Sequence, residues 1–195
     1  MMTGVGLRVG ITSVLRRYCV GARRTLRARF VYLCAAGLVA CAPAPETGFR
    51  DSSVPIAATT RFSPEAFSGT WQVIEAYPTP LFPGCGDQRW EARLADAAPQ
   101  LVVRCGAQVR AATPVEVDPR GRLQLVSPDL DLPDRALWVL WMDEDARTAV
   151  IGTPSGEMGW ILNRSADLRA DRRVAAREIM AFNGYDITGL QEIGP

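Results

Sequence analysis

The chain has 195 residues, of which 48% are hydrophobic, which is enough for one domain with a real core and too few for two. Its 22 basic and 21 acidic residues sum to a net charge of +1. There is no histidine, and every basic residue is an arginine. This composition excludes histidine-based catalytic triads, imidazole metal sites, P-loop lysines and Schiff-base lysines.

Residues 1–40 have the composition of an export signal. They contain seven arginines and no acidic residue, so the rest of the chain carries 15 basic and 21 acidic residues, a net charge of −6. An uncharged run at 30–40 follows the last of these arginines. This run is shorter than the roughly 20 apolar residues that span a membrane, and it matches the hydrophobic region of a signal peptide. The negative charge of the remaining chain argues against nucleic-acid binding.

The last three residues of this run and the cysteine after them, Leu38-Val39-Ala40-Cys41, resemble the lipobox of bacterial lipoproteins. The resemblance implies cleavage before Cys41, acylation of that cysteine, and an outer-membrane lipoprotein that faces the periplasm. The alternatives are an ordinary signal peptide or a buried apolar helix. Residues 41–61 are rich in Pro, Ala, Ser and Thr, and they are expected to form a lipidated tether.

Eight apolar segments follow from residue 69 onward, separated by Pro, Gly and Asp. Their spacing, about 12 residues with the turn included, is typical of β-sandwiches and barrels. Since no helical stretch long enough for a parallel crossover interrupts them, we expect an antiparallel sheet. The predicted strands are 70–77, 88–94, 100–105, 108–112, 122–127, 136–142, 148–152 and 159–164.

One amphipathic helix is predicted at 171–183, ending before a glycine. Ala175, Ile179 and Phe182 recur at helical spacing and are expected to form its buried face. The strand at 136–142 is apolar on both faces rather than alternating. We therefore expect the helix to cover the outside of this part of the sheet.

Three segments at the two ends of this region carry recognisable motifs. They are Phe-Ser-Gly-Thr-Trp at 67–71, the segment 137–164 and the segment 184–190. In this order, they resemble the Gly-x-Trp motif, the last three strands and the C-terminal tail of bacterial outer-membrane lipocalins. The resemblance implies that residues 62–195 form an all-β domain, an eight-stranded antiparallel up-and-down β-barrel with one C-terminal α-helix packed on its outside. Such a barrel has room inside for one small ligand.

The resemblance also assigns structural roles at the closed end of the barrel. Trp71, which belongs to the motif with Gly69, is expected to stack on Arg164, and both are expected to be structural rather than ligand-binding. Two departures from the family pattern occur: Ala146 stands where a hairpin aromatic is usual, and residues 88–127 match no family motif. The lack of a family motif at residues 88–127 affects the expected size of the ligand more than the expected fold.

Two of the five cysteines, Cys85 and Cys105, remain after signal cleavage and lipidation. In an oxidising compartment such a pair favours a disulfide, and a closed loop of about 20 residues contributes on the order of 3 kcal/mol. The alternative is a catalytic thiol like that of isomerases with a cavity cysteine. With no histidine or lysine present, an arginine such as Arg104 would have to activate it.

Candidate ligand-binding residues follow from strand alternation. If Trp71 points inward, Val73, Glu75 and Tyr77 share its face. The carboxylate of Glu75 lies either in the cavity, paired with an arginine or a ligand head group, or at the mouth in water. Aromatic candidates line the cavity or pack under the helix. These aromatic candidates are Trp90, Trp138 and Trp160.

We therefore expect a non-catalytic lipoprotein that binds a small hydrophobic ligand, such as a fatty acid or lysophospholipid, and that reaches the membrane through its N-terminal lipid. No cofactor is predicted, and the acidic triplet at 143–145 lacks the further ligands of a calcium site. One alternative is a lipid-modifying enzyme that uses Cys105 or Glu75. Another is a structural lipoprotein whose filled barrel binds a protein partner.

Overall fold

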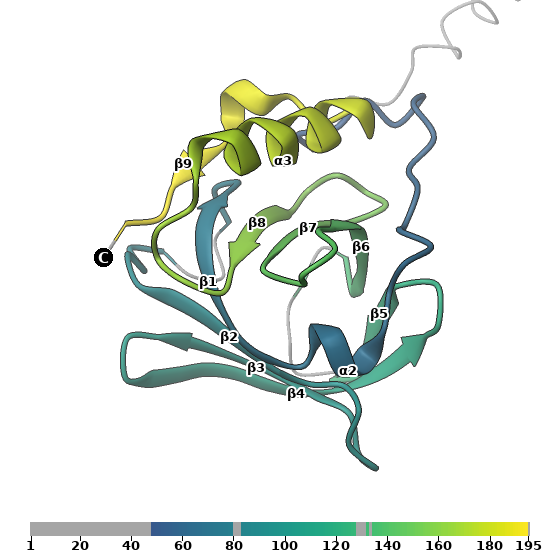
Figure 1. Cartoon of the computed structure of the whole chain (residues 1–195), viewed down its shortest axis with the longest axis vertical. Coiled ribbons are helices and arrows are strands. Elements are labelled where there is room, and N and C mark those ends of the chain that lie inside the picture. Colours follow the sequence, from purple (N-terminus) through teal and green to yellow (C-terminus); the bar gives the residue numbers. More distant parts are fainter. Residues whose placement is uncertain (1–47, 80–82, 128–131, 133, 195) are drawn as a thin grey trace, which may run out of the picture. The chain divides into compact units, whose positions relative to one another are not determined.

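The computed structural model describes residues 48–79, 83–127, 132 and 134–194. Figure 1 shows its strands arranged in a ring, with a long helix on the outside. The strands are β1 (Gly69–Ala76), β2 (Gln88–Arg93), β3 (Gln100–Cys105), β4 (Gln108–Asp118), β5 (Arg122–Leu125), β6 (Ala136–Met142), β7 (Thr148–Gly152), β8 (Gly159–Asn163) and β9 (Gln191–Glu192). The helices are α2 (Pro64–Phe67), α3 (Ala170–Phe182) and the 3₁₀ helix η1 (Ile187–Gly189).

Strands β1 to β8 form a closed antiparallel barrel. Each strand pairs with the next along the chain, and β1 pairs with both β2 and β8. Trp71 of β1 lies opposite Trp90 of β2, and β9 continues this side of β1 opposite Glu75 and Ala76. Closure gives each strand of the ring a neighbour on both sides, so the barrel satisfies their backbone groups internally. The predicted barrel fold is confirmed.

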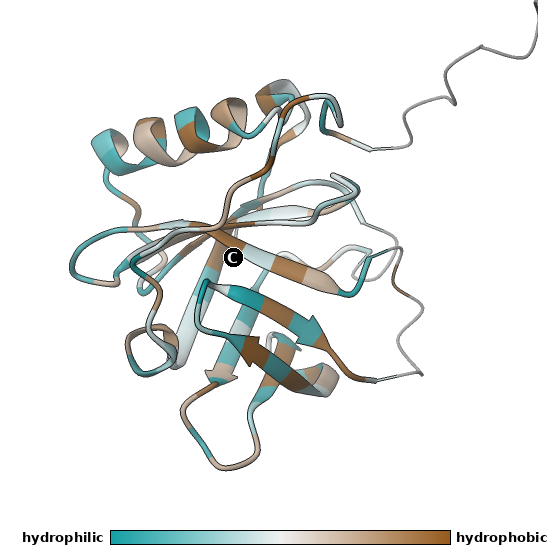
Figure 2. Ribbon diagram, turned by 90° about the vertical axis from the view of Figure 1, so that its right-hand side faces the viewer, coloured by the Kyte–Doolittle hydropathy of each residue, from teal (hydrophilic) through white to brown (hydrophobic). Residues whose placement is uncertain are grey.

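Two apolar clusters lie on opposite sides of this sheet. The interior cluster fills the barrel with alternate side chains from all eight strands, and the outer cluster lies between the sheet and α3, which Figure 2 shows across one outer side of the barrel. Large members of the interior cluster are Trp71, Trp90, Leu101, Leu123, Ile151 and Trp160. The outer cluster includes Ile74, Tyr77, Leu140, Val150, Ile161 and Met180.

A β-bulge in β1 changes which of its residues face inward. The pairing with β8 shifts register between Val73 and Glu75, so one extra residue of β1 is accommodated there. Val73 belongs to the interior cluster, whereas Tyr77 belongs to the outer one, and Ala76 is the next interior residue. The prediction that Glu75 and Tyr77 share the inward face of Trp71 is therefore wrong, because strict alternation ends at the bulge.

Helix α3 packs against β6 and β7 with a different face from the predicted one. Its buried residues are Ala176 and Met180, while Ile179 is partly buried against the outer cluster. Phe182 is 76% exposed. The expected face of Ala175, Ile179 and Phe182 is thus rotated relative to the observed one. The small Ala176 lets the helix approach the sheet closely, and the flexible Met180 fills the remaining space.

Strand β4 is longer than predicted, because it continues through Pro114 to Asp118. A proline has no N–H to donate to a neighbouring strand, which usually ends a central strand. Here Pro114 lies opposite Gln100, the first residue of β3, where the ladder between the two strands ends. Its carbonyl still accepts a hydrogen bond from the N–H of Val126.

Residues 48–61 pack against the domain, so the prediction of a free tether is wrong for this segment. The N–H of Thr59 donates to the carbonyl of Val139, and Arg50 pairs with Tyr185 in an isolated bridge. The Arg50 guanidinium is buried and donates from Nε to the carbonyl of Asn183 at 2.7 Å. The export signal at 1–40, Cys41 and the rest of the predicted tether lie outside the described residues.

No helix in the described part of the chain has both the length and the apolar character needed to cross a membrane.

Candidate functional site

One end of the barrel is closed by α2 and by the stack of Arg164 on Trp71. The guanidinium carbon lies 3.6 Å from the centroid of the indole ring, and the indole N–H donates to the carbonyl of Phe67 at 2.8 Å. Arg164 also donates to the carbonyls of Ala66 and Thr70 at 2.7 and 3.0 Å. Burial lowers the pKa of Arg164 from its ordinary value. The geometry matches the structural role that the resemblance implied for these two residues.

Gly69 makes this closed end possible. Its φ of +107° lies in a region that side chains rarely adopt, and a Cβ there would lie 3.1 Å from Nη1 of Arg164. The glycine of the motif therefore leaves room for the arginine that covers Trp71.

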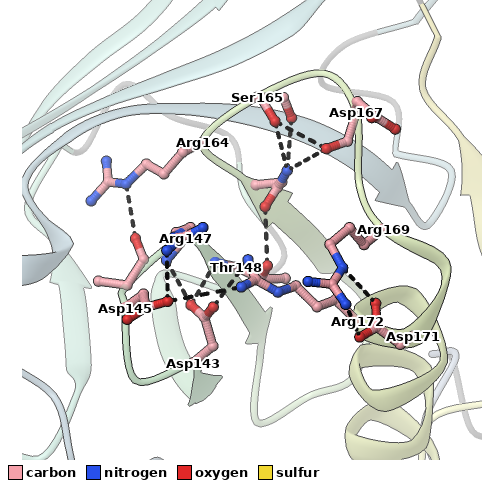
Figure 3. A network of polar contacts seen from close by, with 12 residues as sticks. Asp143, Asp145, Arg147, Thr148, Arg164, Ser165, Asp167, Arg169, Asp171 and Arg172 are labelled. Carbon is pink, nitrogen blue, oxygen red and sulfur yellow. Dashed lines mark hydrogen bonds and ion pairs between the residues drawn. The ribbon is translucent and has the colours of Figure 1, made fainter.

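The acidic hairpin between β6 and β7 is part of the same end (Figure 3). Oδ1 of Asp143 accepts from the N–H groups of Arg147 and Thr148 at 2.6 and 2.8 Å, and its other oxygen pairs with Arg172 of α3 at 3.2 Å. Asp145 pairs with Arg147 at 2.8 Å. Among the described residues there is no group of three His, Cys, Asp or Glu side chains that could hold a metal ion. The carboxylates of this hairpin tie it to the helix.

A cavity of about 90 Å³ lies inside the barrel. Most of its wall is apolar, and Thr113 supplies the one side-chain oxygen among the described lining residues. Arg110, an exposed residue, also borders it. The lining residues are Trp90, Leu101, Val103, Arg110, Ala111, Thr113, Leu125, Leu132, Leu137, Met158 and Trp160.

Trp90 and Trp160 meet at this cavity with their ring centroids 5.0 Å apart and an interplanar angle of 64°. Both Nε1 atoms are buried, and neither has a hydrogen-bond partner. Nε2 of Gln88, two residues before Trp90 on the same face of β2, is also buried and unpaired. Buried donors normally have a hydrogen-bond partner. Three unpaired donors close together therefore distinguish this part of the interior from the rest of the core.

The opposite end of the barrel has a groove of about 460 Å³ beside the disulfide. Cys85, in the loop between β1 and β2, is bonded to Cys105 at the end of β3, with the Cα atoms 5.6 Å apart. This is the predicted pair, and it leaves no free thiol at either position. Arg104, the arginine proposed to activate a thiol, instead pairs with Glu91 at 2.5 Å. The hypothesis of a catalytic Cys105 is therefore wrong for this structure.

Glu75 lies outside the barrel, where it is completely buried under α3. Its two carboxylate oxygens accept from Arg173 at 2.5 Å and Arg177 at 2.8 Å. Arg173 also pairs with Glu192 of β9 at 2.7 Å. Glu75 thus neither lines the cavity nor lies in water at the mouth, and the alternative that it serves as a catalytic group there loses its basis.

Two of the predicted aromatic candidates also lie on the outer side. Tyr77 is buried beside α3 and donates its hydroxyl hydrogen to the carbonyl of Asp186 at 2.9 Å, and burial raises its pKa above the ordinary value. Trp138 packs against the outer cluster, and the guanidinium carbon of Arg122 lies 4.2 Å from its ring centroid. Their placement in the cavity is wrong, for Tyr77 because of the bulge and for Trp138 because its face of β6 is covered from outside.

Of the predicted ligand-binding residues, Trp90 and Trp160 line the cavity, and Val73 lies in the interior cluster without bordering it. Sequence reasoning missed Arg110 and Thr113. Arg110 is the extra residue at a register shift between β3 and β4, and the sequence carries no signal for such a shift. Thr113 lies just beyond the strand predicted at 108–112, in the part of β4 that the prediction left out.

A closed eight-stranded up-and-down barrel with an apolar interior and an outer C-terminal helix is the architecture of a ligand-binding protein of the lipocalin type. A family model described as a lipocalin-like domain matches residues 64–195. The chain belongs to the lipocalin family, whose members bind small hydrophobic ligands.

Individual relatives are distant. Temperature-induced lipocalin-1 of Arabidopsis thaliana is 38% identical over 55 residues, which are 28% of this chain and 30% of the plant protein. Insecticyanin from the tobacco hornworm Manduca sexta has a TM-score of 0.57 at 14% identity over 76% of this chain and 87% of its own. The cockroach allergen Per a 4 has a TM-score of 0.55 at 12% identity over 74% and 96%. At these identities the structural matches show the fold alone.

Proposed function

We propose that this chain is a cell-envelope lipoprotein that carries a small hydrophobic or amphiphilic ligand, such as a fatty acid or a lysophospholipid, inside its barrel without acting on it chemically. The observation that supports this proposal is the apolar cavity beside Trp90 and Trp160 in the closed barrel. Burial of an acyl chain there would contribute about 0.8 kcal/mol per CH₂ group before ordering costs.

The size of the cavity indicates how such a ligand enters. About 90 Å³ corresponds to about three water-sized groups, so a longer chain requires side chains to move apart. We expect the ligand to enter from the groove beside the disulfide, since Gln88 borders the groove and Trp90, on the same face of β2, borders the cavity. The end of a ligand would reach the tryptophans through this end of the barrel.

The binding proposal is tested by filling the cavity. Ala111→Phe places a large side chain in the cavity wall, whereas Ala112→Phe changes the next, exposed residue of the same strand. We expect dodecanoic acid to quench the tryptophan fluorescence of the wild type and of Ala112→Phe, with at least tenfold weaker binding by Ala111→Phe.

Equal affinity of the two variants would place the ligand elsewhere. If wild-type protein purified from its native membrane releases no lipid into organic solvent, and dodecanoic acid leaves its fluorescence unchanged, the binding proposal fails. That result would favour the alternative of a barrel filled by its own side chains.

The membrane part of the proposal rests on the sequence around Cys41 and has its own test. We expect wild-type protein to incorporate labelled palmitate and to sediment with the outer membrane, and Cys41→Ala to do neither. Cys85→Ala, which removes a cysteine of the domain, should keep the label. Membrane association of Cys41→Ala equal to that of the wild type would contradict the lipid anchor.

A further inference from the structure

The two tryptophans that line the cavity carry indole N–H donors without acceptors. Nε1 of Trp90 and Nε1 of Trp160 are both buried, and neither has a hydrogen-bond partner in the structure. An indole has a donor and no acceptor, so only an incoming acceptor can satisfy it. Leaving a buried donor unpaired is unfavourable, and a native interior retains few such groups.

The packing of the two rings does not account for both donors. In an edge-to-face pair the edge of one ring faces the π-system of the other, so an N–H to π contact can engage at most one of the two indoles. At least one N–H group remains without a partner.

The surroundings of these donors are poor in acceptors and include a cation. No described residue that lines the cavity carries a carboxylate. The one side-chain oxygen among them is the hydroxyl of Thr113, which donates to the carbonyl of Pro114 at 3.2 Å and accepts from neither indole. Arg110 borders the cavity and is exposed, and it forms no ion pair with any described residue. The site therefore offers neutral donors inside and a positive charge at its rim.

Resting on the proposed binding function, we propose that the ligand is an anionic amphiphile whose buried chain carries a carbonyl oxygen. The carbonyl oxygen has two lone pairs and accepts from the indole N–H of Trp90, of Trp160 or of both. The anionic group remains at the rim beside Arg110. Since both nitrogens are shielded from solvent, binding includes a rotation of at least one indole ring.

A matched series of ligands tests this inference. Dodecanoic acid and its 4-oxo, 7-oxo and 10-oxo derivatives share chain length and carboxylate and differ only in a ketone and its position. We expect calorimetric titration to show that at least one oxo acid binds wild-type protein three- to tenfold more tightly than dodecanoic acid, the gain of about one net hydrogen bond.

Variants then identify the donors. In Trp90→Phe/Trp160→Phe the ratio of affinities between that oxo acid and dodecanoic acid should fall to about one, since phenylalanine keeps an aromatic ring and lacks the N–H. The ratio cancels the effect of repacking on both ligands. Trp141→Phe, a change in the outer cluster, should leave the ratio at its wild-type value. The single variants Trp90→Phe and Trp160→Phe serve if the double variant does not fold.

Arg110→Gln should weaken the binding of every acid in the series by a similar factor of three to ten. The ratio of affinities between the oxo acid and dodecanoic acid should therefore stay unchanged. Arg93→Gln, at an exposed position on the outside of β2, should change neither the affinities nor their ratio. An Arg110→Gln protein that binds all four acids as the wild type does would overturn the anionic end of the assignment.

The failures are distinguishable. If dodecanoic acid binds and no oxo acid binds more tightly, or if the oxo acid keeps its advantage in Trp90→Phe/Trp160→Phe, the carbonyl assignment is overturned while the binding function stands. If none of the four acids binds, the proposed function itself fails.

Discussion

The carboxylate of Glu75 is fully buried although it lies outside the barrel. It accepts hydrogen bonds from Arg173 and Arg177, whose side chains are 29% and 37% exposed, and the second of these contacts is 2.8 Å long. A buried carboxylate needs such partners, because its desolvation is otherwise uncompensated. At the scale of single residues, these two ion pairs and the stack of Arg164 on Trp71 hold buried polar groups outside the cavity. None of them contributes to the cavity.

Removal of the Glu75 charge is expected to destabilise the domain. In Glu75→Gln the two arginines face a neutral amide, and we expect the free energy of unfolding to fall by about 2 kcal/mol. The loss stays moderate because the arginines are partly exposed and solvent screens their charges. Urea unfolding at pH 7 measures it. Glu192→Gln, which removes the 72% exposed partner of Arg173, should cost less than about 0.5 kcal/mol. Equal losses in the two variants would show that burial of Glu75 is energetically unimportant.

At the scale of elements, contact with the sheet sets which face of α3 is buried, and the amphipathic pattern of the helix does not. Its buried residues, Ala176 and Met180, are four positions apart and face β6 and β7. Phe182, the most apolar-looking member of the predicted face, points away from the sheet. The outer surface of the barrel therefore selects the helix face, and the sequence periodicity alone leaves more than one choice.

Substitutions on the two faces should separate these alternatives. Met180→Ala removes a fully buried side chain under the helix, and we expect it to lower the free energy of unfolding by about 2 to 4 kcal/mol. Phe182→Ala should change it by less than about 0.5 kcal/mol, since that side chain is largely exposed. Chemical denaturation of both proteins measures the difference. A larger loss for Phe182→Ala than for Met180→Ala would restore the helix face predicted from the sequence.

At the scale of the whole molecule, two buried tyrosines join segments that are distant along the chain. The hydroxyl of Tyr185 accepts from the N–H of Thr153 at 2.7 Å and lies 2.9 Å from the carbonyl of Thr153, which links the C-terminal tail to the loop between β7 and β8. Tyr77 bonds to Asp186 and stacks on Phe49 with the ring centroids 4.5 Å apart. Residues 48–61, the barrel and the tail therefore meet at these rings.

The same tyrosines predict alkaline unfolding. Burial raises the pKa of Tyr77 and of Tyr185 above the ordinary value of 10.0, so the unfolded chain loses these protons first as pH rises. The stabilisation that the two protonated tyrosines contribute to the folded state is complete below pH 10. Above pH 10 it falls by up to about 1.4 kcal/mol per tyrosine for each pH unit. The chain contains no lysine to obscure the effect.

Urea unfolding at pH 8, 10 and 11 measures this dependence, and absorbance at 295 nm reports tyrosinate. We expect tyrosinate to appear together with unfolding, and the slope above pH 10 to decrease in Tyr77→Phe. Full ionisation of both tyrosines near pH 10 in the folded protein would contradict the prediction.

The fold class could be predicted before folding was considered, because the regular spacing of short apolar segments favours an antiparallel sandwich or barrel, and the resemblance at residues 67–71, 137–164 and 184–190 implies the barrel. The sequence also favours the Cys85–Cys105 disulfide, and it names Trp90 and Trp160 among the tryptophans that either line the cavity or pack under the helix. The folded structure was needed to place Glu75 outside the barrel, because one extra residue at the β1 bulge reverses the side chains that follow it. It likewise decided the buried face of α3 and the docking of residues 48–61, since both depend on surfaces built by strands far away in the sequence.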